Sequence, residues 1–313
     1  MDVDLAGDEA GTRPRVAYVL GGGGMLGAAE VGMLRGLEEG GIVPDMVLGT
    51  SVGALNGVMV AAQPSGSSDR LERLWNDIEA RDPFGGSLFA RLATIARSGT
   101  HIHDNTRLSR LLHEALPVRR FEQLEVPFQC VAASIERSSA RWFDRGPLIP
   151  AVLASSAVPA LLPPVRIDGE HYLDGGLVHS IPVGRAVALG ATEIYVLQVG
   201  RIEQPLEAPS TPWEVGVVAF EIARRHRFVE EMSRIPEEVT VHVLPTGSSD
   251  PLKPTDPRQL RYRDASGLGE RIAAAHRATA TYLTFSEASP GAELDTDVAA
   301  DDVATSAQPD GRG

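Results

Sequence analysis

Apolar residues recur along this chain in two alternating patterns, as short continuous runs and as longer stretches with helical spacing. Continuous runs predict buried strands at 15–20, 45–48, 126–133 and 192–199, and a last strand at 239–244. Helical spacing predicts helices at 28–39, 54–62, 69–78, 104–116, 182–189, 212–235 and 265–283. Two short runs joined by Asp168-Gly169 predict a hairpin over 165–173. Strands that alternate with helices predict a three-layer α/β fold around a mainly parallel sheet.

The second predicted strand runs into Gly49-Thr50-Ser51-Val52-Gly53, and a predicted helix follows. This is the G-x-S-x-G pattern of a nucleophile elbow, in which a serine occupies a tight strand-to-helix turn. The turn leaves little room beside the serine, so glycine is expected at Gly49 and Gly53. The free amides of the following helix would favour negative charge on a reacting oxygen. Chance occurrence in a glycine-rich chain is the competing explanation, so the pattern needs support from its context.

A glycine cluster, Gly21-Gly22-Gly23-Gly24-Met25-Leu26-Gly27, lies between the first predicted strand and helix. Its bare backbone amides suit an anion, either a phosphate or the oxyanion of an acyl-transfer intermediate. The cluster also fits the G-x-G-x-x-G pattern of dinucleotide sites. That pattern requires an acidic residue at the end of the next strand. Asp45 instead precedes that strand, which weakens the nucleotide interpretation.

Asp174 is followed by Gly175 and Gly176 directly after the predicted hairpin. Most Asp-Gly pairs only mark turns, and that is our interpretation of Asp168-Gly169. At Asp174, the two glycines permit a sharp bend at a strand end, where the carboxylate can face a neighbouring strand's terminus.

These three motifs, in this order and with the run 154–164 before the aspartate, resemble the patatin-like phospholipase family. The resemblance covers residues 15 to 200, with a weaker likeness at 266–283. It implies a serine acyl hydrolase that acts through a Ser-Asp dyad, with Ser51 as nucleophile and Asp174 as base. It also implies an oxyanion hole formed from backbone amides of Gly22, Gly23, Gly24 and Val52. Gly27, Gly49, Gly53, Gly175 and Gly176 match the motif glycines.

The implied reaction needs no cofactor and no metal, and its substrate is a lipid or a small ester. One departure from the family pattern is Leu26, because the glycine loop of the family usually has a basic side chain at this position. Any help from that side chain is absent here, and backbone amides remain. We therefore expect activity to be retained, with a weaker enzyme or a different ester preference as the alternative.

Two other functions stay open at this stage. One is a Ser-Asp-His esterase of the α/β-hydrolase type, for which His171 and His179 beside Asp174 are the candidates. Only one strand and one helix precede Ser51, whereas that fold normally has several strands before its elbow, so the dyad is favoured. The other is a catalytically silent protein that binds a lipid or a nucleotide.

Composition is consistent with one catalytic domain at 14–285. The 313 residues are 43% hydrophobic and 23% charged, enough to bury a sizeable core. The single cysteine, Cys130, allows no internal disulfide, and His101-x-His103 is better explained as a surface loop than as a metal site. Residues 1–13 and the acidic stretch 286–313 are expected to be disordered tails.

Charge and hydropathy limit location and partners. The net charge of −13 disfavours nucleic acid. The first residues lack the features of a secretory signal, and no run has the length of a membrane span, so we expect a cytoplasmic protein. The predicted helix at 212–235 contains the basic cluster Arg224-Arg225-His226-Arg227, offset by Glu221, Glu230 and Glu231. Its charges are better explained as solvated, and transient contact with a membrane surface is the alternative.

Overall fold

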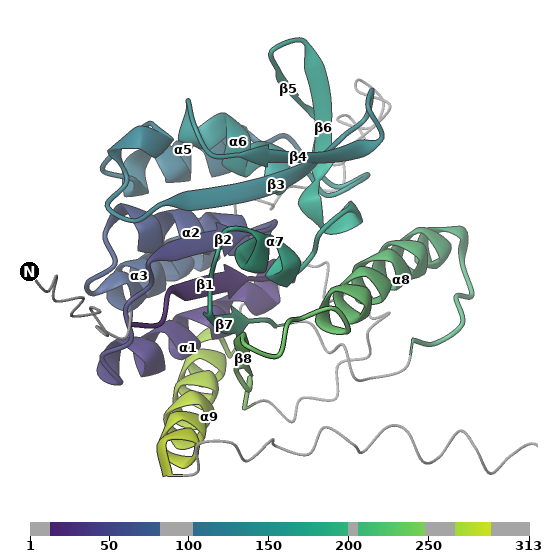
Figure 1. Cartoon of the computed structure of the whole chain (residues 1–313). Coiled ribbons are helices and arrows are strands. Elements are labelled where there is room, and N and C mark those ends of the chain that lie inside the picture. Colours follow the sequence, from purple (N-terminus) through teal and green to yellow (C-terminus); the bar gives the residue numbers. More distant parts are fainter. Residues whose placement is uncertain (1–12, 82–102, 200–205, 248–266, 289–313) are drawn as a thin grey trace, which may run out of the picture.

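A single mixed sheet runs through the molecule and is covered by helices on both faces (Figure 1). The computed structural model describes residues 13–81, 103–199, 206–247 and 267–288. The strands are β1 (Val16–Leu20), β2 (Met46–Gly49), β3 (Phe128–Ser134), β4 (Ser139–Phe143), β5 (Val165–Ile167), β6 (Glu170–Asp174), β7 (Glu193–Leu197) and β8 (Thr240–Val243). Their order is β5-β6-β3-β2-β1-β7-β8, and β4 pairs with β3. The α/β sandwich predicted from the sequence is therefore confirmed.

The sheet is parallel in one part and antiparallel in the other. Strands β3, β2, β1, β7 and β8 run parallel to one another, as the alternation of strands and helices predicts. β4 and β6 pair antiparallel with β3, and β5 pairs antiparallel with β6. The β5–β6 hairpin turns at Asp168 and Gly169, both of which have positive φ, as a tight two-residue hairpin requires.

The pairing of β3 brings the ends of β2 and β6 together. Cys130 pairs with Gly49 of β2 on one edge and with Phe143 of β4 on the other. Two residues later, Ala132 pairs with β4 again and with Asp174 of β6. β2 and β6 therefore lie on the same edge of β3 and run towards each other. Because the carboxyl ends of β2 and β6 face each other along β3, the residues after Gly49 meet Asp174.

Two buried clusters lie on the two faces of the sheet, because alternate residues of each strand point to opposite sides. Tyr18, Leu20 and Val47 face the larger cluster. Ala17, Val19 and Leu48 face the smaller one. The helices that contribute to the larger cluster are α1 (Ala28–Glu39), α2 (Val52–Ala62), α3 (Ser67–Arg81), α5 (Thr106–Ala115), α6 (Leu148–Ser155) and α9 (Leu268–Ala288). The smaller cluster is covered by α7 (Val183–Ala188) and α8 (Pro212–Met232).

Three short 3-10 turns complete the described chain: η1 (Gly24–Gly27), η2 (Phe121–Gln123) and η3 (Gly175–Leu177). β4 and α6 were not predicted from the sequence. The closing helix α9 continues to Ala288, three residues past the boundary expected at 285. Residues 1–12 and 289–313, expected to be tails, lie outside the described residues. No helix in the described part of the chain combines the length and apolar character needed to span a bilayer.

Candidate active site

Ser51 occupies the turn between β2 and α2 in a strained conformation. Its φ is 56° and its ψ is −124°, a combination that side-chain-bearing residues rarely adopt. The turn is as tight as the sequence predicts. A Cβ atom at Gly49 would lie 2.4 Å from the Gly53 carbonyl oxygen, and one at Gly53 would lie 2.3 Å from that of Leu20. Only glycine fits at either position, so the geometry is that of a nucleophile elbow.

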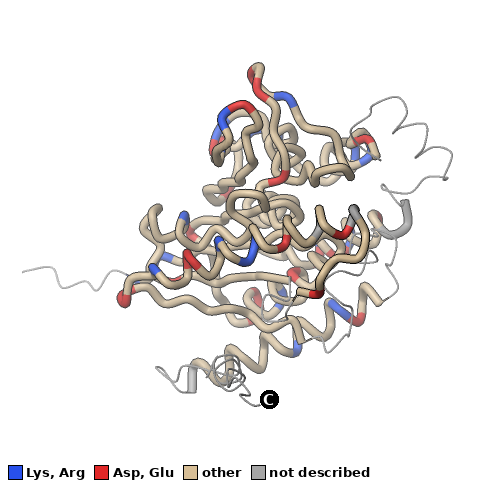
Figure 2. Tube along the Cα trace, turned by 90° about the vertical axis from the view of Figure 1, so that its right-hand side faces the viewer, with Lys and Arg blue, Asp and Glu red and all other residues tan. Residues whose placement is uncertain are grey.

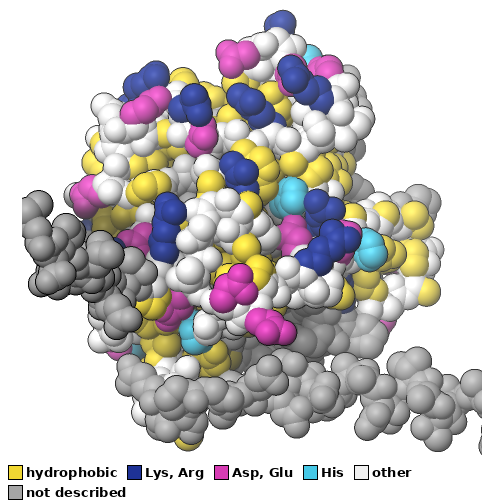
Figure 3. Space-filling view, in the orientation of Figure 1, with side chains coloured by type: hydrophobic (Ala, Val, Ile, Leu, Met, Phe, Trp, Pro, Cys, Tyr) yellow, Lys and Arg dark blue, Asp and Glu magenta, His cyan; other side chains and the backbone are white. Residues whose placement is uncertain are grey.

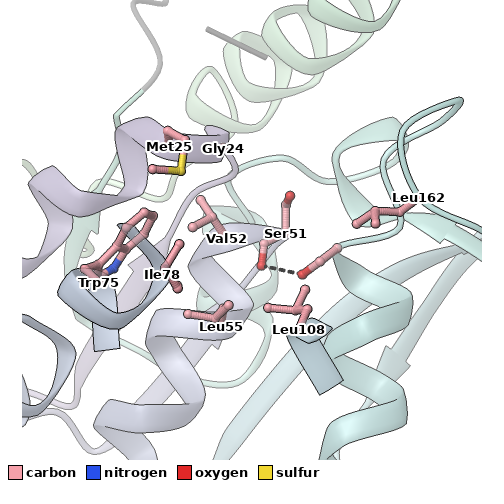
Figure 4. Close-up of a pocket in the computed structure, with 10 residues that line it drawn as sticks. Gly24, Met25, Ser51, Val52, Leu55, Trp75, Ile78, Leu108 and Leu162 are labelled. Carbon is pink, nitrogen blue, oxygen red and sulfur yellow. Dashed lines mark hydrogen bonds between the residues drawn. The ribbon is translucent and has the colours of Figure 1, made fainter. Parts of the chain in front are cut away.

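Two serines at the end of α6 hold the backbone of Ser51. The Ser51 amide donates to Ser155 Oγ at 3.1 Å, and Ser156 Oγ donates to the Ser51 carbonyl at 3.0 Å. The second bond is the dashed line in Figure 4. With the backbone held in this way, the Ser51 side chain points away from that bond. The residue is 7% exposed and lines a pocket. Both serines belong to the run 154–164, but neither was predicted to have a role of its own.

Asp174 is buried at the end of β6, with 1% of its surface exposed. Its Oδ1 accepts a hydrogen bond from the Gly176 amide at 2.7 Å. Glycine is required at position 175, because a Cβ there would lie 2.2 Å from the Val131 carbonyl oxygen. A Cβ at Gly176 would lie 2.9 Å from the Phe220 ring, which would have to shift. Burial raises the pKa of Asp174 to about 6, although Ser51, the Gly176 amide and Arg224 each favour the ionised carboxylate.

Ser51 and Asp174 lie together, as the sequence motifs predict. The Ser51 hydroxyl is close enough to the carboxyl group to lower its pKa. No hydrogen bond of ordinary length and angle joins the two side chains. Asp174 Oδ2 is buried without a hydrogen-bond partner among the described residues. A buried carboxylate oxygen in this state is able to accept a proton from a hydroxyl that rotates towards it.

Three backbone amides on the elbow and the glycine loop have no partners in the described chain, those of Val52, Gly23 and Gly24, and of these residues Val52 and Gly24 line the same pocket as Ser51. The Gly22 amide, which the sequence analysis includes among the oxyanion donors, is not available, because it donates to the Ser180 carbonyl at 3.1 Å. Gly22 nevertheless adjoins Ser51, since a Cβ there would lie 3.3 Å from Ser51 Cβ. Gly27 packs directly on Val52, where a Cβ would lie 2.5 Å from Val52 Cγ2.

A narrow apolar pocket opens beside Ser51 (Figure 4). Its lining consists of Gly24, Met25, Ser51, Val52, Leu55, Trp75, Ile78, Leu108, Ser156 and Leu162. The cavity volume is about 30 Å³, which is room for a water molecule but not for an alkyl chain. Side chains of the lining would therefore have to move before the pocket could admit a long apolar group.

The two histidines considered as third triad members have other partners. His171 Nδ1 lies 2.7 Å from Glu136 Oε1, and His179 Nδ1 lies 2.6 Å from Glu231 Oε1. Asp45, the acidic residue considered for a nucleotide ribose, forms an ion pair with Arg13 and accepts from the Val16 amide at the start of β1. The glycine cluster follows the opposite end of that strand. These placements count against both alternatives.

Metal ligation has no support in the described part of the chain, where no group of three or more His, Cys, Asp or Glu side chains lies together. His101 is outside the described residues. Cys130 is buried, and burial raises the pKa of its thiol far above the ordinary value.

The basic cluster on α8 is not uniformly solvated, in contrast to the sequence-based interpretation. Acidic and basic positions are interspersed over the described chain (Figure 2), and on α8 Arg227 pairs with Glu230 and Glu231 near the surface. Arg224 instead turns inward and is 7% exposed. Its Nη2 donates to the Gly22 carbonyl at 3.0 Å. The glycine loop therefore has a cationic neighbour that its local sequence does not reveal.

Comparison with known proteins supports the family resemblance that the order of the three motifs suggested. The family model described as patatin-like phospholipase matches residues 18–187. A patatin-like phospholipase domain-containing protein of Caenorhabditis elegans is 33% identical over 193 residues, which are 60% of this chain and 14% of that protein. Patatin-like phospholipase domain-containing protein 6 of Homo sapiens is 30% identical over 59% of this chain and 13% of its own length. A lysophospholipase of Emericella nidulans is 30% identical over 60% of this chain and 12% of its own length.

The match to these relatives thus involves only about a seventh of their length or less. Among solved structures, VipD from Legionella pneumophila aligns with 87% of this chain and 67% of its own, with a TM-score of 0.43 and 13% identity. Because the family model spans more than half of the chain, the chain belongs to the patatin-like phospholipase family.

Proposed function

We propose that this chain is a serine acyl hydrolase that cleaves fatty-acyl esters of lipids through an acyl-enzyme, with Ser51 as nucleophile and Asp174 as general base. The observation that carries the proposal is the convergence of three features at one place. A serine on a strained elbow lines an apolar pocket, a buried carboxylate with an unpaired oxygen lies beside it, and the elbow and the adjoining glycine loop carry backbone amides without partners in the described chain.

In the first half of the reaction, Asp174 takes the proton of the Ser51 hydroxyl while Oγ forms a bond to the ester carbonyl carbon. The carbonyl oxygen becomes an oxyanion. When the tetrahedral intermediate collapses, the bond to the leaving alkoxide breaks and Asp174 returns the proton to it. In the second half, water takes the place of the serine hydroxyl and releases the fatty acid.

Burial of Asp174 supports its role as a base. A carboxylate in water is too weakly basic to take a serine proton readily, whereas desolvation raises its pKa to about 6 here. At neutral pH the group is still mostly ionised, so it combines the correct protonation state with increased basicity.

The proposed oxyanion donors are the amides of Gly23, Gly24 and Val52. The first two precede and begin η1, and the third is the first residue of α2, where the helix dipole adds to the field of the amide. Loss of one such donor typically costs about 3 kcal/mol of activation free energy.

The pocket supports an acyl chain as the group that is recognised. Its wall is apolar except for Ser51 and Ser156, and it leads away from the nucleophile between α2, α3 and α5. The relatives named as lysophospholipases support a lipid ester as the substrate class. Transient contact with a lipid surface is part of the proposal, since Val215, Ile222 and Val229 on α8 are each more than half exposed and apolar groups lie over that side of the molecule (Figure 3).

The proposal is tested by labelling with a fluorophosphonate probe and by turnover of nitrophenyl esters of increasing acyl length. We expect the wild type to be labelled and active. Ser51→Ala should lose labelling entirely, and both Ser51→Ala and Asp174→Asn should lose at least about a thousandfold in kcat. Ser139→Ala, at an exposed serine of β4, is the matched control and should behave as wild type. Turnover that survives Ser51→Ala would remove Ser51 as the nucleophile.

A further inference from the structure

Arg224 is a buried cation on the inner face of α8. Charged side chains are seldom buried at this level unless every donor has a partner. Its guanidinium group contacts two segments that are distant in sequence and one residue of its own helix. Nη2 donates to the Gly22 carbonyl at 3.0 Å, Nε donates to Ser180 Oγ at 2.7 Å, and Nη1 donates to Glu221 Oε1 at 2.9 Å.

The contact with Gly22 determines where an adjacent amide points. The Gly22 carbonyl and the Gly23 N–H belong to one planar trans peptide, so they point in opposite directions. When Arg224 holds the carbonyl, it also fixes the N–H, which has no partner among the described residues. Donation from a charged group polarises the peptide further and strengthens its N–H as a donor.

The position of this peptide makes its orientation relevant to Ser51. Gly22 packs closely against Ser51, because a Cβ atom at Gly22 would lie only 3.3 Å from Ser51 Cβ. The Gly22 amide is held by Ser180, whose hydroxyl also accepts from Arg224. Both sides of Gly22 are therefore fixed by the same small network, and the first free amide after it is that of Gly23.

The charge of Arg224 acts at Asp174 as well. It favours the ionised carboxylate and opposes the effect of burial, as do the Ser51 hydroxyl and the Gly176 amide. Glu221 faces the guanidinium from the same helix and partly offsets its charge.

We propose that Arg224 is a positioning residue, which orients the Gly22–Gly23 peptide as an oxyanion donor and thereby makes α8 part of the active site. The inference rests on the proposed function of Ser51 and Asp174. It explains how a glycine loop with Leu26 at its sixth position still has a cation beside it.

The test uses Arg224→Gln in the full chain, with ester turnover and inhibitor binding as readouts. We expect kcat to fall about 10- to 100-fold with KM changed less than threefold, because the lost interaction serves the transition state. A trifluoromethyl ketone, which forms a tetrahedral adduct with an oxyanion, should bind more weakly by a similar factor. A non-reactive ether analogue of the same chain length should bind as it does to the wild type. The acid limb of the pH–rate profile should move to higher pH.

Further variants keep the test decisive if Arg224→Gln folds poorly. Arg224→Lys keeps the charge, so the acid limb should stay near its wild-type position while kcat still falls. Ser180→Ala removes one anchor of the guanidinium and should reduce kcat about three- to tenfold. Arg234→Gln, at a largely exposed arginine paired with Glu230, is the control and should match the wild type.

Outcomes that overturn the inference are distinct from those that overturn the proposed function. Wild-type kcat and ketone binding in folded Arg224→Gln, or equal weakening of the ketone and the ether, would remove the positioning role alone. A wild type without Ser51-dependent turnover would overturn both.

Discussion

At the scale of single residues, Asp174 has the least ordinary environment in the site. Its carboxyl group is almost fully removed from water, one oxygen is held by the Gly176 amide, and the other is unpaired. Burial raises its pKa from the ordinary value to about 6. A carboxylate acts as a base only when it is ionised. The activity of the enzyme should therefore depend on pH near the raised pKa of Asp174, above the range in which most carboxylates titrate.

We therefore expect kcat/KM of the wild type to be constant from about pH 7 to 8 and to fall about tenfold per pH unit below pH 6. The direction follows from the role, because protonation of Asp174 removes the acceptor for the Ser51 proton. The measurement is a pH–rate profile from pH 4.5 to 8 on a soluble ester, with preincubation at each pH followed by assay at pH 7 to exclude unfolding. The residual activity of Asp174→Asn should lack this inflection, and a flat wild-type profile down to pH 5 would contradict the assignment.

The sequence was sufficient to propose Ser51 and Asp174 as partners that lie together, because each lies in a short motif whose geometry is local. It was not sufficient for the residues that hold them. Arg224 lies fifty positions after Asp174 in a helix of mixed charge, and only the packing of α8 on the sheet decides that this arginine turns inward. The hydrogen bond of the Gly22 amide likewise depends on tertiary structure, since its acceptor is the carbonyl of Ser180, which is distant in sequence.

At the scale of elements, a buried polar network joins the helices behind the glycine loop. Asn56 of α2 donates to the Gly27 carbonyl at 3.0 Å and to Glu30 of α1 at 2.7 Å. It also accepts from the indole N–H of Trp75 of α3 at 3.0 Å. Burial raises the pKa of Glu30 well above its usual range. Asn56 is thus the common partner of η1, α1 and α3, and of these η1 and α3 line the pocket.

Asn56→Leu is expected to lower the free energy of unfolding by about 2 to 4 kcal/mol, because it leaves the indole N–H, the Gly27 carbonyl and Glu30 without their buried partner. Glu30→Gln keeps an oxygen that accepts from Asn56, so we expect a change of less than about 1 kcal/mol at pH 7. Urea unfolding followed by circular dichroism measures both. Equal stability of Asn56→Leu and wild type would mean that the network adds nothing to the packing of these helices.

Local patterns identified the parallel strands, the antiparallel β5–β6 hairpin and most helices, but not β4 or α6. β4 is a five-residue strand with a single buried residue, and α6 is apolar on nearly all sides and contains Pro150, so neither has the periodicity that marks an element. Nor does any local pattern state that β2 and β6 end against the same edge of β3. That pairing brings Ser51 to Asp174.

At the scale of the whole molecule, the last described helix closes the fold on its first one. α9 lies against α1 (Figure 1), although more than 200 residues separate them in the chain. The contact depends on Gly32 and Gly36, which are one helical turn apart on α1. A Cβ at Gly32 would lie 2.1 Å from the Ile272 carbonyl oxygen, and one at Gly36 would lie 2.7 Å from Thr279 Cγ2. α9 lies outside residues 18–187, the region that the family model matches.

Gly32→Ala should therefore destabilise the protein, although alanine is the better helix former. The added methyl group meets backbone rather than a flexible side chain, so the two helices must separate, at a cost of about 1 to 3 kcal/mol. Gly216→Ala, in the second turn of α8 with open space around it, is the matched control and should stabilise the protein by about 0.5 to 1 kcal/mol. Thermal and urea unfolding of both variants compare the same chemical change at two helix positions. If Gly32→Ala were as stable as Gly216→Ala, α9 would not be held against α1 at this distance. Ile272 and Ala275 of α9 would then not pack with the α1 residues of the larger buried cluster.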